Sequence, residues 1–433
     1  MGTHPAPRRF SYDRRVHSWT SPALTPLPAS GKPLRLFDTR TGRIAPVVPL
    51  TPGTARLYVC GITPYDATHL GHAATYHSAD LMRRALRDTG LEVEMAQNIT
   101  DVDDPLLERA DRDGVDWQEL AASQVELFAE DMTALRVVAP ETYRSVSEAM
   151  DDIIATVTAL HERGRAYQVA TPDAEGEDWY LDLSVDGALG DVSGWTEEQM
   201  LEVFADRGGD PDREGKRGRF DPLLWRAERE GEPAWDAGVL GRGRPGWHVE
   251  CVCIAEDGLG LPFDIQAGGS DLVFPHHDLS AAHSVALGRP FAASYAHAGM
   301  VAYEGEKMSK SLGNLVFVHR LVRGGVDPMV IRLVLMAHHY RSDWEWSDDE
   351  LAEAGRRLEA YRSAARRRDL RADVVEALRA ALRDDLDTPA ALAALDAWAD
   401  GSALPGTAEE LPADAPGDVA AATDALFGLA LND

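Results

Sequence analysis

Residues 56–100 have the sequence RLYVCGITPYDATHLGHAATYHSADLMRRALRDTGLEVEMAQNIT, and this stretch decides the fold. Its first seven residues (56–62) are apolar and bounded by turn residues, which predicts a buried strand. Residues 73–90 carry apolar side chains at helical spacing and stop at a glycine, and residues 91–100 alternate like a second strand. A strand, a helix and a strand in this order predict a βαβ unit with parallel strands.

The same alternation returns after a long insertion. The second block is expected to contain a helix at 246–258, a strand at 262–266, a helix at 270–288 and a strand at 298–303. Two such blocks predict the α/β class, with a doubly wound parallel sheet. The first strand is not followed by the Gly-x-Gly-x-x-Gly pattern of dinucleotide sites.

The insertion and the two ends of the chain differ from these blocks. We expect a helix at 148–164, a strand at 178–184 and a long exposed loop at 205–220, and mostly helices after residue 320. The predicted organisation is an N-terminal extension that is poorly ordered (1–35), a first half of a catalytic core (36–120), an inserted connective region (121–245), a second half of the core (246–345) and a helical C-terminal domain (346–433).

Composition excludes several classes of protein. The 433 residues carry a net charge of −29, which disfavours binding to nucleic acid mainly through charge. No apolar run reaches the roughly 20 residues of a membrane span, and no apolar stretch follows the basic N-terminus as in a secretory signal. Three cysteines cannot build a disulfide framework, so we expect a reduced, cytoplasmic protein without a membrane partner.

Two short motifs carry the candidate catalytic residues. His69 and His72 lie between the first strand and its helix, where open α/β sheets bind anions. The chain has only four lysines, and two of them, Lys307 and Lys310, fall within KMSKS at 307–311. A solvated turn would also suit that segment. Together, the two motifs predict that a histidine turn and a lysine loop close on one triphosphate.

The two motifs resemble the HIGH and KMSKS signatures of class I aminoacyl-tRNA synthetases. The surrounding text, YVCGITPYDATHLGH, NITDVDDPL, GWHVEC, GGSDLVFPHHD and GEKMSKSLGN, is similar to cysteinyl-tRNA synthetases over roughly residues 56–345. The resemblance implies a class I synthetase fold with a Rossmann-like sheet, a connective insertion and a helical C-terminal domain. It also implies ATP-dependent activation of L-cysteine, with Mg²⁺ accompanying ATP and one zinc ion in the amino-acid pocket.

The candidate zinc ligands are Cys60, Cys251 and His276. Soft thiolates and an imidazole suit Zn²⁺, and three protein ligands leave a position for the substrate thiol. The alternative is that both cysteines are small core residues. The family supplies a Glu four residues after the histidine, where this chain has Ser280. His277 is a weaker substitute, because neighbours on a helix point apart.

Other residues follow from the resemblance. Cys253 is assigned to packing, and Trp247 either walls the cysteine pocket or belongs to the core. The lysines would stabilise charge on the α-phosphate and the leaving pyrophosphate. The residues expected to hold the adenylate and its cysteine are Cys60, Gly61, Ile62, Thr63, Thr75, Asn98, Ile99, Thr100, Trp247, Gly269, Ser270, Asp271, Val301 and Lys310.

The acceptor of the activated cysteine is a separate question. Residues 321–433 contain 12 Lys and Arg against 22 Asp and Glu, and no basic residue follows position 383. This tail lacks the basic surface of an anticodon-binding module. The shortened acidic chain is similar to the actinobacterial cysteine–amino-sugar ligases of mycothiol biosynthesis, and the DRGGDP loop (206–211) matches them too.

That second resemblance implies an amide-forming ligase. Cysteine would be joined to the amine of glucosaminyl-inositol through a cysteinyl-adenylate, with release of AMP and pyrophosphate. We then expect small-molecule partners, no nucleic acid, and a monomer. The DRGGDP loop either borders the sugar pocket or is a solvated turn. Two alternatives stay open, namely a cysteinyl-tRNA synthetase with a reduced C-terminal domain and a non-enzymatic zinc-binding paralogue.

Overall fold

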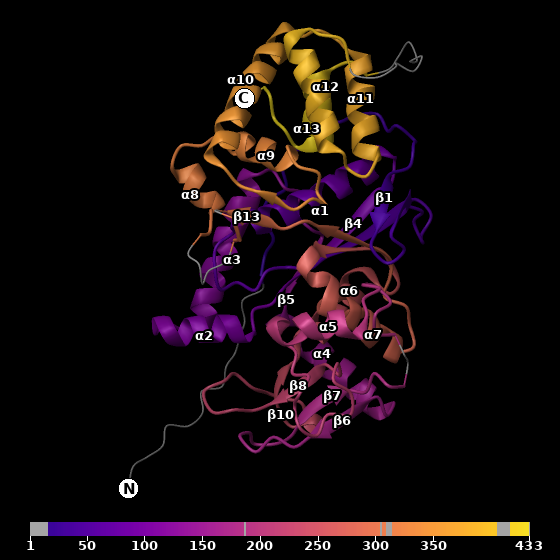
Figure 1. Cartoon of the computed structure of the whole chain (residues 1–433), viewed down its shortest axis with the longest axis vertical. Coiled ribbons are helices and arrows are strands. Elements are labelled where there is room, and N and C mark those ends of the chain that lie inside the picture. The colour runs from indigo at the N-terminus through magenta and orange to yellow at the C-terminus, as the bar shows by residue number, and fades with distance from the viewer. Residues whose placement is uncertain (1–15, 186–187, 304, 309–313, 405–415, 433) are drawn as a thin grey trace.

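The centre of the fold is a five-stranded parallel sheet with the strand order β12-β11-β3-β4-β5. The computed structural model describes residues 16–185, 188–303, 305–308, 314–404 and 416–432 (Figure 1). The sheet consists of β3 (Thr54–Val59), β4 (Glu92–Ile99), β5 (Thr142–Ser145), β11 (Phe263–Gly269) and β12 (Ala292–Ala298). Strands β3 and β11 pair directly, so the two sequence blocks meet in mid-sheet, and the α/β prediction is confirmed.

Helix α1 (Leu70–Asp88) packs on the sheet and contributes many buried residues to the main hydrophobic core. Its N-cap is His69, whose side chain accepts a hydrogen bond from the Gly71 amide, and Gly90 (φ +96°) ends the turn after it. Leu81, Met82 and neighbouring apolar residues of α1 are buried in the main hydrophobic core. The helix thus begins three residues before the predicted start.

The second block departs from prediction in two places. Helix α6 (Trp247–Leu259) forms as expected, but the expected helix 270–288 is divided into a 3-10 turn η3 (Ser270–Leu272), a π-turn η4 (Val273–His277) and α7 (Asp278–Ala286). Phe274 is extended (φ −137°, ψ 135°), because a residue before proline is forced out of the helical region.

The predicted strand 298–303 is also wrong, since it spans a break between two sheets. Strand β12 ends at Ala298, and β13 (Val301–Tyr303) pairs with β14 (Glu306–Lys307) and β15 (Trp344–Glu345) in a small separate sheet. The reason lies at Gly299, where an added Cβ would lie 2.3 Å from the Ser342 carbonyl oxygen. The chain therefore passes too close to the 340–343 loop to continue in the parallel sheet.

The insertion builds a second sheet, which is antiparallel and has the order β6-β7-β8-β10-β9. Its strands are β6 (Ala166–Val169), β7 (Asp178–Leu181), β8 (Leu223–Ala227), β9 (Trp235–Asp236) and β10 (Arg242–Pro245). Helix α4 (Val146–Glu162) packs on β6, and α5 (Glu197–Phe204) lies between β7 and β8 in the chain. Helices α2 (Asp104–Asp113) and α3 (Trp117–Ala134) pack on each other, and α3 also packs on the main core and on α8. Figure 1 places this sheet at the end of the molecule opposite the C-terminal helices.

The N-terminal segment is better ordered than its composition predicts. Residues 16–34 run as an extended segment in which Trp19 is buried and donates from Nε1 to the Val137 carbonyl oxygen at 2.7 Å. A hairpin of β1 (Arg35–Asp38) and β2 (Arg43–Pro46) follows. The prediction of a poorly ordered extension is therefore wrong for residues 16–35, while residues 1–15 lie outside the described part.

The C-terminal part is helical, as predicted. It consists of α8 (Val318–Arg323), α9 (Pro328–Met336), α10 (Asp348–Arg367), α11 (Ala372–Arg383), α12 (Thr388–Asp400) and α13 (Val419–Phe427). Arg332 is fully buried and joins α9 to the Asp80 carboxylate of α1 and to the carbonyl oxygen of Phe427. Among the described residues, no helix has the length and apolar character needed to cross a membrane.

Candidate active site

Three side chains of the types that bind metal ions meet at the carboxyl edge of the parallel sheet. Cys60 directly follows β3, Cys251 lies in the first turns of α6, and His276 lies in η4. Their ligand atoms all lie within 4.8 Å of one another, and His276 Nε2 is 3.2 Å from Cys251 Sγ. All three are buried, with Cys60 the most accessible at 5%. The structure thus brings together residues that are as many as 216 positions apart in the sequence.

The chemistry of this donor set fits a thiophilic metal ion. Contact with Cys60 and then burial raise the pKa of the Cys251 thiol well above its ordinary value, so this thiol favours the neutral form without a nearby cation. A bound divalent cation reverses this preference because it stabilises the thiolate. Two sulfurs and one imidazole nitrogen suit Zn²⁺ and leave one tetrahedral position for a further ligand.

The residue after His276 also faces the sulfurs. His277 Nε2 lies 3.3 Å from Cys60 Sγ, and Gln266 Nε2 donates to the same sulfur at 3.2 Å. Adjacent residues can both approach the cluster because η4 does not have regular helical geometry. Ser280, which occupies the position of the family's Glu, instead donates to the His276 carbonyl oxygen at 2.7 Å. The sequence signal that could have found Gln266 is a polar residue within the buried strand FDIQAGG.

Two side chains set the orientation of the His276 ring. Trp247 stacks on it with ring centroids 4.3 Å apart and an interplanar angle of 21°. His248 Nδ1 lies 2.9 Å from His276 Nδ1, so that the opposite nitrogen, Nε2, faces Cys251. Hydrogen bonding at one ring nitrogen fixes which nitrogen is available to a metal. Trp247 therefore lies against the Cys/His cluster and is half-buried.

A cavity of about 280 Å³ lies at the same edge of the sheet, where Thr63 follows β3 and Gly269 ends β11, and both histidines of the histidine motif line it. The His69 and His72 rings stack with centroids 3.9 Å apart at the N-terminus of α1. An added Cβ at Gly71 would lie 2.8 Å from His69 Cε1, so this position has no room for a side chain. Backbone amides at a helix N-terminus attract anions. The predicted residues that line the cavity are Thr63, His69, His72, Thr75, Gly269, Asp271 and Val301.

Several other predicted residues do not line the cavity. Asn98 Oδ1 accepts from the Gly61 amide at 2.7 Å, and Asn98 Nδ2 donates to Thr100 Oγ1 at 3.0 Å. These bonds hold the loop that presents Cys60. Ile62 and Ile99 are buried, and Ser270 begins η3 beside the cavity. Among KMSKS residues, the backbone of Lys307 lies in β14, and Lys310 lies outside the described residues.

A group of buried acids lies near the cluster, and sequence analysis missed it. Burial raises the pKa of Asp101 to about 6, and burial with the neighbouring charge of Asp104 raises that of Asp103 to about 6. Burial and the carboxyl of Asp103 raise the pKa of Glu250 well above its ordinary value. The acidic text TDVDD was a visible signal, but nothing in it shows that Asp101 is buried.

Comparison with known proteins supports one family. The model of the family described as tRNA synthetases class I (C) catalytic domain matches residues 46–356. A solved Mycobacterium tuberculosis methionyl-tRNA synthetase in complex with methionyl-adenylate aligns with a TM-score of 0.58 at 15% identity, over 80% of this chain and 81% of that one. This likeness shows the class I synthetase fold.

Two curated relatives are much more similar and carry the same name. The L-cysteine:1D-myo-inositol 2-amino-2-deoxy-alpha-D-glucopyranoside ligase of Brachybacterium faecium is 82% identical over 96% of this chain and 100% of its own length. The ligase of that name from Cellulomonas flavigena is 57% identical over 95% of this chain and 99% of its own length. Matches of this identity over nearly the whole length of both chains show the family. The chain therefore belongs to the family of L-cysteine:1D-myo-inositol 2-amino-2-deoxy-alpha-D-glucopyranoside ligases, which are built on the class I synthetase fold.

Proposed function

We propose that this chain ligates L-cysteine to the amine of an inositol-linked 2-amino-2-deoxy-glucopyranoside, using ATP and releasing AMP and pyrophosphate. The observation that carries the proposal is that the Cys60–Cys251–His276 cluster and the cavity lined by His69 and His72 are both built at the carboxyl edge of the parallel sheet. One edge thus offers sulfur and imidazole donors for a thiol-selective site and a helix N-terminus for an anion. The names of the relatives supply the sugar acceptor.

In the first step, the cysteine carboxylate attacks the α-phosphorus of ATP, a new C–O–P linkage forms, and pyrophosphate leaves. When bound to Cys60, Cys251 and His276, Zn²⁺ would supply a Lewis acid that favours the thiolate form of the substrate thiol. Trp247 would pack against the bound amino acid, and the α1 N-terminus with His69 would stabilise phosphate charge. Lys307 and Lys310 would neutralise charge on the leaving pyrophosphate, with Mg²⁺ on the triphosphate.

In the second step, the neutral amine of the sugar attacks the carbonyl carbon of cysteinyl-adenylate. The C–N amide bond forms, the mixed-anhydride C–O bond breaks, and AMP leaves while the amine loses a proton. A metal held by Cys60, Cys251 and His276 would bind the substrate thiol, and a thiol so bound would be less available as a competing nucleophile. Selection by a site that needs a sulfur ligand discriminates cysteine from serine more strongly than size alone.

We propose a small-molecule acceptor in preference to tRNA. The supporting observation is charge, since the 50 residues from Asp384 to Asp433 carry acidic groups and no Lys or Arg. Contacts to phosphates need clustered basic side chains, and this tail cannot supply them. The cytoplasmic location and the monomeric state stay predictions from the sequence.

The test is a ligation assay with the purified full-length chain, ATP, Mg²⁺, L-cysteine and glucosaminyl-inositol. We expect an ATP-dependent amide product of the mass of cysteine plus the amino sugar minus water, with one AMP per amide. The control replaces the amino sugar with glucose-inositol, which has no amine and should give no product. Robust charging of tRNA with no amide formed would refute the proposal in favour of the synthetase alternative.

A further inference from the structure

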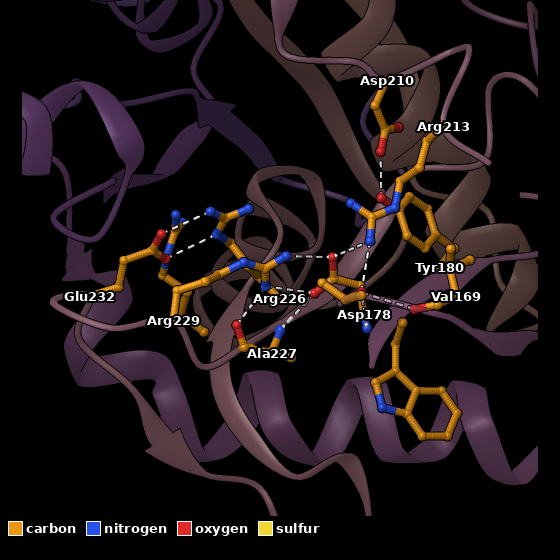
Figure 2. Close-up of polar contacts among 12 residues, drawn as sticks. Val169, Asp178, Tyr180, Asp210, Arg213, Arg226, Ala227, Arg229 and Glu232 are labelled. Carbon is orange, nitrogen blue, oxygen red and sulfur yellow. Dashed lines mark hydrogen bonds and ion pairs between the residues drawn. The ribbon is translucent and has the colours of Figure 1, made fainter. Parts of the chain in front are cut away.

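The 205–220 loop is anchored to the inserted sheet by ionic contacts, which fix its position. Figure 2 shows the Asp178 carboxylate, which accepts two hydrogen bonds from Arg229 at 2.8 Å and pairs with Arg213 of the loop at 2.9 Å. Farther along, Asp210 accepts from the Tyr180 hydroxyl and from Lys216 Nζ, the latter at 2.7 Å. The loop has little regular secondary structure, as predicted, yet its base is rigid.

From this fixed loop, one side chain reaches the candidate active site. Arg207, in the short 3-10 turn Ala205–Arg207, donates from one terminal nitrogen to the carbonyl oxygens of Asp271 at 2.9 Å and Phe274 at 2.5 Å. Its guanidinium also lies 5.9 Å from the Trp195 ring. The two carbonyls belong to η3 and η4, where the backbone departs from regular helix and cannot satisfy all its own oxygens.

The insertion holds the other end of the same segment. The buried Asp278 carboxylate accepts from the amides of Val192 at 2.8 Å and Ser193 at 3.2 Å. Between the two anchors, Phe274 packs against Phe204, with ring centroids 5.9 Å apart. Residues 271–278 are therefore held at both ends and in the middle by one inserted region.

This held segment carries groups from both halves of the site. Asp271 lines the cavity that His69 and His72 also line, and His276 is one of the three clustered side chains that could hold a metal. Charged donors make stronger hydrogen bonds than neutral ones, and a guanidinium nitrogen can serve two acceptors without moving. Any displacement of the Phe274 carbonyl is transmitted to His276 two residues later.

We propose that Arg207 is a positioning residue, through which the insertion fixes the 271–278 segment in the conformation that presents His276 to a metal. The inference rests on the proposed function only in taking Cys60, Cys251 and His276 as the ligands. It assigns to the DRGGDP loop a role in metal binding, in place of contact with the sugar or simple solvation.

The test compares Arg207→Met, which keeps the side-chain stem but removes the donors, with Arg207→Lys, which restores one cationic donor group. Co²⁺ is the probe, and its affinity is measured by chelator competition through its thiolate absorption band. We expect Arg207→Met to bind Co²⁺ about tenfold more weakly, in line with other outer-shell partners of metal ligands, and Arg207→Lys to recover most of the loss. The matched control is Arg219→Met in the same loop, whose exposed ion pair with Asp212 touches no site residue.

Asp278→Asn provides a second measurement at the other anchor, which decides the matter if Arg207→Met does not fold. We expect weaker Co²⁺ binding there too. The proposal is overturned if Arg207→Met binds Co²⁺ as tightly as Arg219→Met does. If Arg207→Met does not fold, the same result with Asp278→Asn overturns it. It is also overturned if Arg207→Lys binds Co²⁺ no more tightly than Arg207→Met while its melting temperature is unchanged. Failure of the proposed function would instead appear as wild-type protein that binds Co²⁺ but forms no amide.

Discussion

The pKa values of acids in the insertion and of acids near the candidate active site are shifted in opposite directions. Burial alone would raise the pKa of Asp178, but hydrogen bonds from Arg229 and the Ala227 amide lower it (Figure 2), and similar bonds from Arg226 and Arg244 bring the pKa of Glu232 to about 2. Near the site, burial raises the pKa of Asp101 to about 6, and in α3 it raises that of Asp131 to about 7.

The contrast is sharpest between two carboxyls that are each only 1% exposed. Asp178 accepts from Arg229 and the Ala227 amide, whereas Oε2 of Glu250 has no hydrogen-bond partner among the described residues. Buried polar groups without partners are costly. Such atoms also occur in the insertion, at Nε of Arg213 and Arg229, so the contrast lies in the carboxyls: arginines pair with that of Asp178, whereas Glu250 keeps an oxygen without a partner among the described residues.

The largest expected effect is loss of a metal donor. Cys251→Ala should lower bound zinc and cysteine-dependent ATP–pyrophosphate exchange together, by more than about 100-fold, since loss of a donor exceeds what loss of an outer partner costs. Zinc is measured by elemental analysis. The control is Cys253→Ala, two residues away in the same helix and buried outside the cluster, which should keep its zinc. Full zinc occupancy in Cys251→Ala would remove Cys251 from the ligand set.

A smaller effect, on stability alone, is expected in the insertion. Asp178→Ala leaves Arg229 buried without its partner, so the free energy of unfolding should fall by about 3 to 5 kcal/mol. Urea denaturation measures the loss. Asp212→Ala, which removes an exposed ion pair with Arg219, should change it by less than about 1 kcal/mol. Equal effects from the two variants would show that the network is not the rigid element described above.

The smallest effect concerns pH. Asp131 is 2% exposed and its pKa is raised from 3.8 to about 7 by burial, so its stabilising, protonated form is lost as pH rises through about 7. Asp131→Asn should therefore raise the free energy of unfolding at pH 8 by about 1 to 2 kcal/mol. The pKa shift corresponds to a cost of up to about 4 kcal/mol, and only part of it is regained because the amide must also be buried. At pH 4 the variant should gain nothing. Thermal melts at pH 4 and pH 8 measure the gain in stability. An equal gain at the two pH values would contradict the raised pKa of Asp131.

Much of this fold could be predicted from the sequence because its signals are local. Apolar runs and glycine stops locate β3, α1 and β4, and the motif text locates Cys60, His69 and His276. The break at Gly299 and the packing of Trp19 could not be predicted, since they depend on contacts between segments far apart in the chain. The π-turn at 273–277 has a local cause in Pro275, and His277 is a weaker ligand substitute only if regular helix geometry is assumed there.

The central claim is that a metal held by Cys60, Cys251 and His276 binds the substrate's own sulfur. X-ray absorption at the zinc edge measures this directly on wild-type protein, with and without saturating L-cysteine and a matched L-serine control. The account predicts two sulfur ligands alone or with serine, from the two clustered cysteines, and a third on addition of cysteine. A sulfur count that stays the same when cysteine is added would contradict it.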